Sequence, residues 1–281
     1  MQTILIICIY VGEMRMNHNI GELASGQVVL ITAGASGIGR CIADSYLAHD
    51  CRVHICDINR SAVDLFLEAH PTATGSVVDV GDAQQVDSLF HDFVTHYEQL
   101  DILVNNAGVA GPTAAVEEVT VEDWNHTVGI DLNGQFYVTR LAVPLLKKAG
   151  GGSIINISSN AALFGCPLRS PYTASKWAMI GLTKTWAMEL GPSNIRVNAL
   201  CPGSVNGERI DRVIVNEARE RGMCEESLRD MYARQSSMRL FVDAQDVANM
   251  ALFLTSNLGA RISGQSIGVD GHTEGLSNWL N

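Results

Sequence analysis

The chain is short of basic residues. Lys and Arg number 19 against 30 Asp and Glu in 281 residues, which gives a formal charge of −11 at pH 7. A nucleic-acid backbone needs a basic face on its partner, so this balance argues against nucleic acid as a ligand. Hydrophobic residues make up 47%, which excludes a disordered chain and is enough for a sizeable core. This length fits one large α/β domain or at most two small ones.

Three other features are missing. No uninterrupted apolar run is long enough to span a membrane. The seven cysteines form no CxxC pair and the eight histidines show no HxxxH or HExxH spacing, so we expect neither a disulfide framework nor a bound metal. Free thiols are typical of a reducing compartment, and we therefore expect a cytoplasmic protein.

The amino terminus carries one apolar octet, residues 4–11 (ILIICIYV). It lacks the basic flank and the cleavage site of a signal peptide, and it is too short to cross a bilayer. Met16 opens a segment that leads directly into the first predicted strand. We expect translation to begin at Met16, with residues 1–15 a non-core extension and 16–281 a single domain. The alternative is a loosely attached apolar segment.

Short β-branched runs alternate with longer helical patterns along the chain. The runs predict strands at 28–32, 52–56, 74–78, 102–104, 153–157, 196–200 and 266–269. Helical patterns occupy 39–48, 82–97, 121–147, 172–190 and 244–255. This alternation predicts an α/β fold, namely a doubly wound parallel sheet with helices on both faces in three layers.

A glycine-rich turn, residues 32–39 (TAGASGIG), follows the first predicted strand and opens a helix. Glycine lets the backbone approach a pyrophosphate, and the free N–H groups of a helix start attract its charge. A strand before the turn and a helix after it are the context that a dinucleotide site requires. The candidate cofactor-binding residues of the turn are Gly34, Ser36, Gly37, Ile38 and Gly39.

Asp57 ends the second predicted strand, 18 residues beyond Gly39. A carboxylate at this place accepts hydrogen bonds from both ribose hydroxyls of an adenosine and repels a 2′-phosphate. The alternative role for Asp57 is that of a helix N-cap. The pattern favours NAD over NADP.

Tyr172 and Lys176 are four residues apart at the start of a predicted helix, so both lie on one helical face. The lysine ammonium can then stabilise the phenolate of a tyrosine that exchanges protons with a substrate. Ser159 follows the preceding strand, where its hydroxyl can donate to a substrate oxygen. A chance YxxxK in an amphipathic helix is the alternative, which the glycine turn and Asp57 disfavour.

With these motifs, the chain resembles the short-chain dehydrogenase/reductase family over about residues 23–275. The segments 79–80 (DV), 105–108 (NNAG), 202–203 (PG) and 263–271 (SGQSIGVDG) carry the rest of the resemblance. The resemblance implies that Tyr172 is the acid/base, that Ser159 positions the substrate oxygen and that Lys176 binds the nicotinamide ribose. The further cofactor contacts that it implies are Asp79, Val80, Asn106, Ala107, Gly108, Pro202, Gly203 and Val205. Hydride then passes between a substrate carbon and the nicotinamide, and a homo-oligomer, commonly a tetramer, is expected.

Three positions depart from the family pattern. Ala33 replaces the first glycine of the turn, a change that we expect the neighbouring Gly34 to accommodate. Asp131 stands where the family has an asparagine that holds a water of the proton relay. An ionised Asp131 can still hold that water, but it opposes the effect of Lys176, so we expect an alkaline optimum for oxidation. A tolerated near-isostere is the alternative. Gly207 replaces a threonine that contacts the nicotinamide carboxamide.

The segment 207–240 is rich in charge and lies late in the chain between two predicted strands, where a substrate-binding lid fits. Arg209 and Arg212 in this segment, and Arg169 near Tyr172, are candidate partners of a polar or carboxylate substrate group. The alternative is a cluster of salt bridges on the lid.

These patterns predict an NAD-dependent oxidoreductase that interconverts a secondary alcohol and a ketone. The charged lid favours a small polar substrate, namely a polyol, a sugar derivative or a hydroxy acid. The alternatives are a 3-ketoacyl reductase, which an acidic protein with Asp57 fits poorly, and a non-catalytic NAD-binding regulator. Neither nucleic acid nor a membrane is expected as a partner.

Overall fold

The computed structural model describes residues 25–273 and 275, so the prediction about residues 1–15 lies outside the described residues. In that part of the chain seven parallel strands form one sheet, in the order β3-β2-β1-β4-β5-β6-β7. The strands are β1 (Val28–Thr32), β2 (Arg52–Asp57), β3 (Thr74–Val77), β4 (Ile102–Asn105), β5 (Gly152–Ile157), β6 (Ile195–Pro202) and β7 (Ser266–Val269). The predicted doubly wound parallel sheet is confirmed, and each strand lies within two residues of its predicted bounds.

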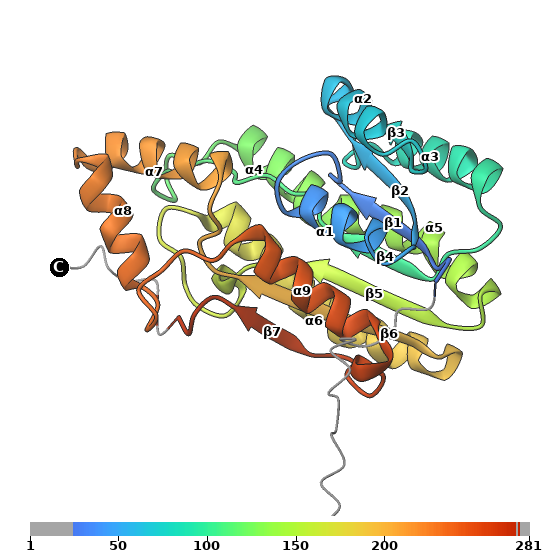
Figure 1. Ribbon diagram of the computed structural model, residues 1–281. Coiled ribbons are helices and arrows are strands. Elements are labelled where there is room, and N and C mark those ends of the chain that lie inside the picture. Colours follow the sequence, from blue (N-terminus) through green and yellow to red (C-terminus); the bar gives the residue numbers. More distant parts are fainter. Residues whose placement is uncertain (1–24, 274, 276–281) are drawn as a thin grey trace, which may run out of the picture.

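Helices cover both faces of this sheet (Figure 1). The described helices are α1 (Gly37–Leu47), α2 (Arg60–Ala69), α3 (Ala83–His96), α4 (Val121–Val128), α5 (Gln135–Lys148), α6 (Ser170–Leu190), α7 (Glu208–Arg221), α8 (Glu225–Arg234) and α9 (Ala244–Thr255). Side chains of α1, α2 and α9 fill the core on one face, and those of α3, α5 and α6 fill the core on the other. The three-layer arrangement is therefore confirmed as well.

The sequence of β1 shows why both faces are covered. Val29 and Ile31 belong to one core, while Val28 and Leu30 belong to the other, and all four side chains are fully buried. Successive side chains of a strand point to opposite faces, so an uninterrupted run of aliphatic residues is stable only between two helical layers.

A chain of buried polar side chains crosses the middle of the sheet. The Asn105 amide on β4 donates to Thr139 Oγ1 on α5 and to Asn156 Oδ1 on β5, both at 2.9 Å. The Asn156 amide then donates to Thr183 Oγ1 on α6 at 2.9 Å. These bonds join both middle strands to the two helices packed on the same face, close to the edge where β4 and β5 end.

The predicted helix over 121–147 is continuous but not uniform. A π-helical segment, η1 (Gly129–Gly134), joins α4 to α5. The wider π turn alters which residues face inward, and here Asp131 is fully buried while Asn133 is exposed. Such single π turns inside α-helices occur frequently at functional sites.

Helices α7 and α8 lie beyond the carboxyl ends of the strands, where the arrowheads of β5 and β7 point in Figure 1. They pack on each other through a small cluster of their own, formed by Ile214, Ala218 and Leu228. Among the described residues, no helix combines the length and the apolar character needed to cross a bilayer.

Candidate active site

The turn between β1 and α1 has the backbone geometry of a phosphate-binding loop. Gly37 has a φ of 55°, and a Cβ placed there would meet no atom within 4 Å, so its backbone stays accessible. A Cβ at Gly39 would instead collide with the Ala33 carbonyl oxygen and the Asn106 side chain. Glycine is thus needed at position 39 for close packing, and at position 37 for the left-handed backbone.

Ala33 takes a left-handed conformation itself, with a φ of 48°. Our expectation that Gly34 would absorb the change is therefore wrong, because the strain stays on the alanine. The turn is held from outside by Asn106, whose side-chain amide donates to the carbonyl oxygens of Thr32 and Ala33, both at 3.0 Å. Thr32 Oγ1 in turn accepts the N–H groups of Asn106 and Ala107, each at 2.9 Å.

Asp57 is buried at the carboxyl end of β2, beside this turn. Its Oδ2 accepts the Ala35 N–H at 3.3 Å and its Oδ1 accepts the Asn59 N–H at 3.0 Å. The alternative of a helix N-cap fails, because the N-cap of α2 is Asn59, which accepts the Ala62 N–H at 3.1 Å. Each carboxylate oxygen keeps a lone pair for a further donor, such as a ribose hydroxyl.

Asp79 and Val80 lie next to Asp57, because β3 pairs with β2 and Asp57 is opposite Val77. Asp79 Oδ1 accepts the Gly81 N–H at 2.8 Å, and the Asp79 N–H donates to Gln85 Oε1 at 3.0 Å. These residues lie at the same edge of the sheet as the cavity described next but do not line it, and the same holds for Gly34, Gly39, Asp57 and Ala107.

A cavity of about 900 Å³ opens at the carboxyl ends of the strands and extends under α7 and α8. It lies where the strand order reverses between β1 and β4, the place where open α/β sheets bind ligands. The predicted site residues in its wall are Ser36, Gly37, Ile38, Asn106, Gly108, Ser159, Arg169, Tyr172, Lys176, Pro202, Gly203, Val205, Arg209 and Arg212. The fold thus brings most of the predicted site residues to one wall.

Tyr172 lies among three cations in this wall. The Arg169 guanidinium carbon, Lys176 Nζ and the Arg209 guanidinium carbon lie 5.2, 5.5 and 5.9 Å from the centre of its ring. Lys176 comes from the next turn of α6, Arg169 precedes that helix, and Arg209 is in the first turn of α7. Positive charge on several sides stabilises negative charge that develops on the phenol oxygen.

Ser159 is buried where β5 passes into the short helix η2 (Asn160–Ala162). Its Oγ accepts the Ala161 N–H at 3.1 Å and donates to Asn160 Oδ1 at 3.3 Å. Both bonds hold the hydroxyl at the wall of the cavity that also contains Tyr172.

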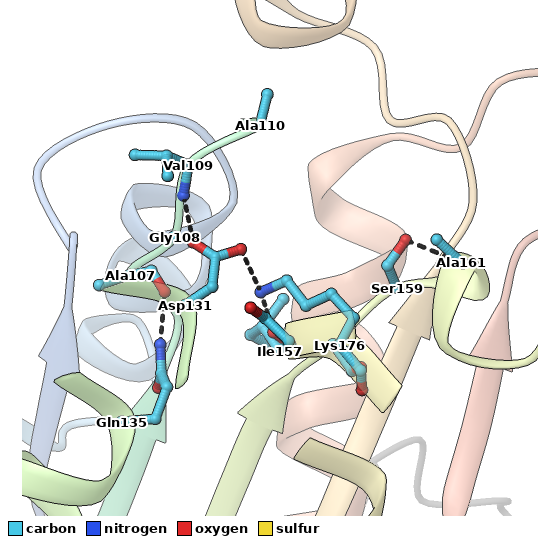
Figure 2. Close-up of polar contacts among 12 residues, drawn as sticks. Ala107, Gly108, Val109, Ala110, Asp131, Gln135, Ile157, Ser159, Ala161 and Lys176 are labelled. Carbon is cyan, nitrogen blue, oxygen red and sulfur yellow. Dashed lines mark hydrogen bonds and ion pairs between the residues drawn. The ribbon is translucent and has the colours of Figure 1, made fainter. Parts of the chain in front are cut away.

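Lys176 forms a buried ion pair with Asp131 (Figure 2). Lys176 Nζ lies 3.5 Å from Asp131 Oδ2 and donates to the Ile157 carbonyl oxygen at 3.3 Å. Asp131 Oδ1 accepts the Val109 N–H at 2.6 Å. The side chains are 3% and 0% exposed, so water screens this pair very little. Asp131 thus touches the lysine directly and fixes the 105–110 segment beside it.

The charged side chains of the segment 207–240 mostly pair with one another. Arg212 pairs with Glu208 at 3.4 Å, Arg229 with Asp211 at 2.6 Å and Arg234 with Asp230 at 2.7 Å. For Arg212 the salt-bridge alternative therefore holds, although this side chain lines the rim of the cavity. Arg209 differs, since it donates to the Gly108 carbonyl oxygen at 3.3 Å.

Sequence reasoning missed three residues of the cavity wall that come from α7 and α8. Glu217 pairs with Arg221 at 3.0 Å and accepts the Tyr232 hydroxyl at 2.5 Å, and all three line the cavity. Burial, and then the neighbouring Glu217 carboxylate, raise the pKa of Tyr232 well above its usual value. Glu217 and Arg221 have the spacing of a solvent-exposed helical pair, so only their partial burial distinguishes them. Among the described residues, no group of three or more His, Cys, Asp or Glu has a metal-binding arrangement.

The chain is similar in sequence to known oxidoreductases. A family model described as "Enoyl-(Acyl carrier protein) reductase" matches residues 32–273. The chain is 34% identical over 250 residues to the 3-oxoacyl-(acyl-carrier-protein) reductase of Thermotoga maritima, covering 88% of this chain and 97% of that protein. It is 35% identical over 262 residues to trans-4-hydroxycyclohexanecarboxylate dehydrogenase of Sinomonas cyclohexanicum, with 90% and 94% covered.

Solved structures show the same fold. The NAD⁺-bound xylitol dehydrogenase superposes with a TM-score of 0.84 at 26% identity, covering 87% of this chain and 98% of that one. An L-sorbose reductase of Gluconobacter frateurii, complexed with NADPH and L-sorbose, gives a TM-score of 0.81 at 26% identity over 91% of this chain and 98% of that one. The chain belongs to the short-chain dehydrogenase/reductase family, and the relatives matched are dehydrogenases and reductases of alcohols and ketones.

Proposed function

We propose that this protein is an NAD-dependent oxidoreductase that interconverts a small polar secondary alcohol and its ketone. The observation that carries the proposal is the wall of one cavity, where Tyr172, flanked by three cations, faces the same space as Ser159 and the glycine turn. In this proposal α7 and α8, within 207–240, form the lid of a single domain.

The residues present fit a nicotinamide dinucleotide. Gly37 exposes its backbone at the amino terminus of α1, where no side chain caps the helix, so free N–H groups are available to a pyrophosphate. Asp57 keeps free lone pairs for ribose hydroxyls at the end of β2. A 2′-phosphate at that carboxylate would be repelled, which supports NAD over NADP, although solved relatives include complexes with either cofactor.

When bound, the cofactor accepts or returns a hydride at the nicotinamide. The protein supplies the proton transfer: Tyr172, as the phenolate, takes the hydroxyl proton of the alcohol and becomes the neutral phenol, while the C–H bond breaks and the carbonyl forms. When substrate binds, the Ser159 hydroxyl turns from Asn160 Oδ1 and donates to the oxygen of the substrate, which orients it. Lys176 holds positive charge near the phenol, and Asp131 holds Lys176 in place while opposing that charge.

The test is turnover of a broad panel of secondary alcohols with NAD, followed by the absorbance of the reduced cofactor. Tyr172→Phe is expected to lower kcat by about 100-fold or more, with the Kd of NAD within threefold of the wild type. Tyr137→Phe, a tyrosine on α5 outside the cavity, serves as the matched control. If NAD binds but nothing reacts, and Tyr172→Phe changes nothing, the protein is a non-catalytic NAD-binding regulator.

A second candidate is a 3-oxoacyl thioester reductase, which the similarity to the Thermotoga enzyme favours. The negative charge of this chain and Asp57 oppose it, because an acyl carrier is itself acidic and such an enzyme would use NADPH. Acetoacetyl thioester with NADPH and with NADH distinguishes the two. Faster turnover of the thioester with NADPH than of any alcohol with NAD would establish the second candidate.

We further propose a cytoplasmic homo-oligomer, a tetramer. Apolar side chains are exposed along α4, α5 and α6, where Trp124, Phe136, Trp177 and Met188 are 40%, 47%, 50% and 81% exposed. Burying them between subunits would remove this surface from water. The six cysteines in the described part of the chain are free thiols, which fits a reducing compartment. Light scattering of the purified protein tests the assembly.

A further inference from the structure

Two arginines beside Tyr172 have no carboxylate partner among the described residues. Arg169 donates to the Ala110 carbonyl oxygen at 2.7 Å, and Arg209 donates to the Gly108 carbonyl oxygen at 3.3 Å. No ion pair involves either guanidinium within the described chain. Most other arginines of the lid pair with an acid, so these two are distinguished by their partners as well as by their place.

The remaining charges near the tyrosine cancel. Lys176 pairs with Asp131, Arg221 pairs with Glu217, and Arg212 pairs with Glu208. The exposed Glu220 also lines the cavity, but it is 11 residues after Arg209 on the same helix, or about 16 Å along its axis. Among the described residues, the wall around Tyr172 therefore carries two positive charges that no ion pair neutralises.

The side chain of Arg169 has a buried hydrogen-bond donor that no described residue satisfies. The residue is 8% exposed, and its Nε is buried without a hydrogen-bond partner. A buried guanidinium with an unused donor costs free energy unless a ligand supplies the acceptor. A carboxylate suits this need, since it accepts two parallel N–H bonds from a guanidinium and brings the compensating charge.

We propose that the substrate is a short hydroxy acid or oxo acid whose carboxylate is bound by Arg169 and Arg209 while its alcohol or keto carbon faces Tyr172. This inference rests on the proposed function and narrows its substrate class. Both guanidinium carbons lie within 6 Å of the tyrosine ring centre, so the carboxylate and the reacting carbon are only a few bonds apart. A polyol or an acyl thioester leaves the two charges unpaired.

The experiment compares 2-, 3- and 4-hydroxy acids with their methyl esters at saturating NAD, in the wild type and in Arg209→Gln. Arg209 is exposed, so its replacement leaves the core intact. Loss of one charge-assisted contact is expected to lower kcat/KM about 30-fold for the preferred acid, mainly through KM, and less than threefold for its ester. Arg219→Gln, on an exposed side of the same helix and outside the cavity, should match the wild type for both.

The outcomes separate the two proposals. If esters or neutral polyols react as well as the acids, or if Arg209→Gln impairs acid and ester equally, the carboxylate site is wrong while the oxidoreductase stands. If no alcohol reacts, the proposed function fails, and the site is then tested by binding. Acetoacetate and succinate should raise the Tm of the wild-type protein with NAD but not of Arg209→Gln, and an equal effect on both would overturn the site.

Discussion

Replacing Asp131 by asparagine should destabilise the protein strongly, because it breaks a buried ion pair from one side. At the observed 3.5 Å between Lys176 Nζ and Asp131 Oδ2, the attraction is about 5 kcal/mol at an effective dielectric constant of about 20. Desolvation offsets much of this in the intact pair, but Asp131→Asn leaves a lysine that is 3% exposed without its counter-charge. Such one-sided losses cost about 3–5 kcal/mol. We expect about 3, since the amide oxygen can still accept the Val109 N–H.

The assay is guanidinium unfolding of the protein without cofactor, at one protein concentration, for Asp131→Asn, Lys176→Met and the double variant. A coupling free energy of about 2 kcal/mol is expected between the two sites. The matched control is Asp87→Asn, because Asp87 pairs with Arg140 at a similar 3.3 Å but both side chains are more than half exposed. It should cost less than about 1 kcal/mol.

Equal losses for Asp131→Asn and Asp87→Asn, or a coupling below about 0.5 kcal/mol, would refute the reasoning. The same Asp131 variant also tests the catalytic prediction. Because the negative charge that opposes Lys176 is gone, the pH optimum for alcohol oxidation should move to lower pH. Identical pH–rate profiles would mean that Asp131 acts only in the structure.

Three further results are expected. Burial lowers the pKa of His54 from 6.5 to about 4, so the folded state binds this proton only at a lower pH than the unfolded state does. As the pH falls from 8 to 4.5, the free energy of unfolding therefore decreases by about 2.5 kcal/mol. His54→Gln should remove this part of the pH dependence of stability. Gly39→Ala should lower the Tm and raise the Kd for NAD at least tenfold, measured by titration, because the new Cβ collides with Ala33. The control Gly181→Ala, where a Cβ meets no atom within 4 Å, should leave the Kd unchanged. Asp57→Ala should raise the KM for NAD about tenfold and permit turnover with NADP, while unchanged cofactor preference would exclude Asp57 from ribose recognition.

Much of the fold could be predicted from the sequence, because most strands are short runs rich in aliphatic residues between turn residues. Helix α2 was missed, although Val63, Phe66 and Leu67 recur at helical spacing and pack on the core, so its apolar pattern could have predicted it. The helix over 121–147 was predicted with nearly its true extent. Its π segment was not, because the wide turn depends on what Asp131 meets in the folded protein and not on local preference.

Some residues of the candidate site could be predicted from the sequence and others could not. Residues that come from motifs at strand ends, such as Ser159 and Tyr172, could be placed at one edge, since parallel strands end together. The sequence spacing could have distinguished Arg212, which forms a salt bridge, from Arg209, which does not. Arg212 has an acidic residue four positions before it, and Arg209 has none. For Arg169 no such signal exists, because its burial and its unpaired Nε follow from loops that meet only in the folded chain.

The hydrogen-bonded asparagines Asn105 and Asn156 affect the register in which β4 and β5 pair. Strands β4 and β5 are apolar on both faces, so a slip by two residues would preserve nearly all of the hydrophobic burial. It would also part Asn105 from Asn156 and leave buried amide groups without partners, at about 1–3 kcal/mol each. The bond between these two asparagines thus favours the observed register of β4 and β5. That register in turn sets the positions of Ser159, Lys176 and the 105–110 segment at the carboxyl edge of the sheet.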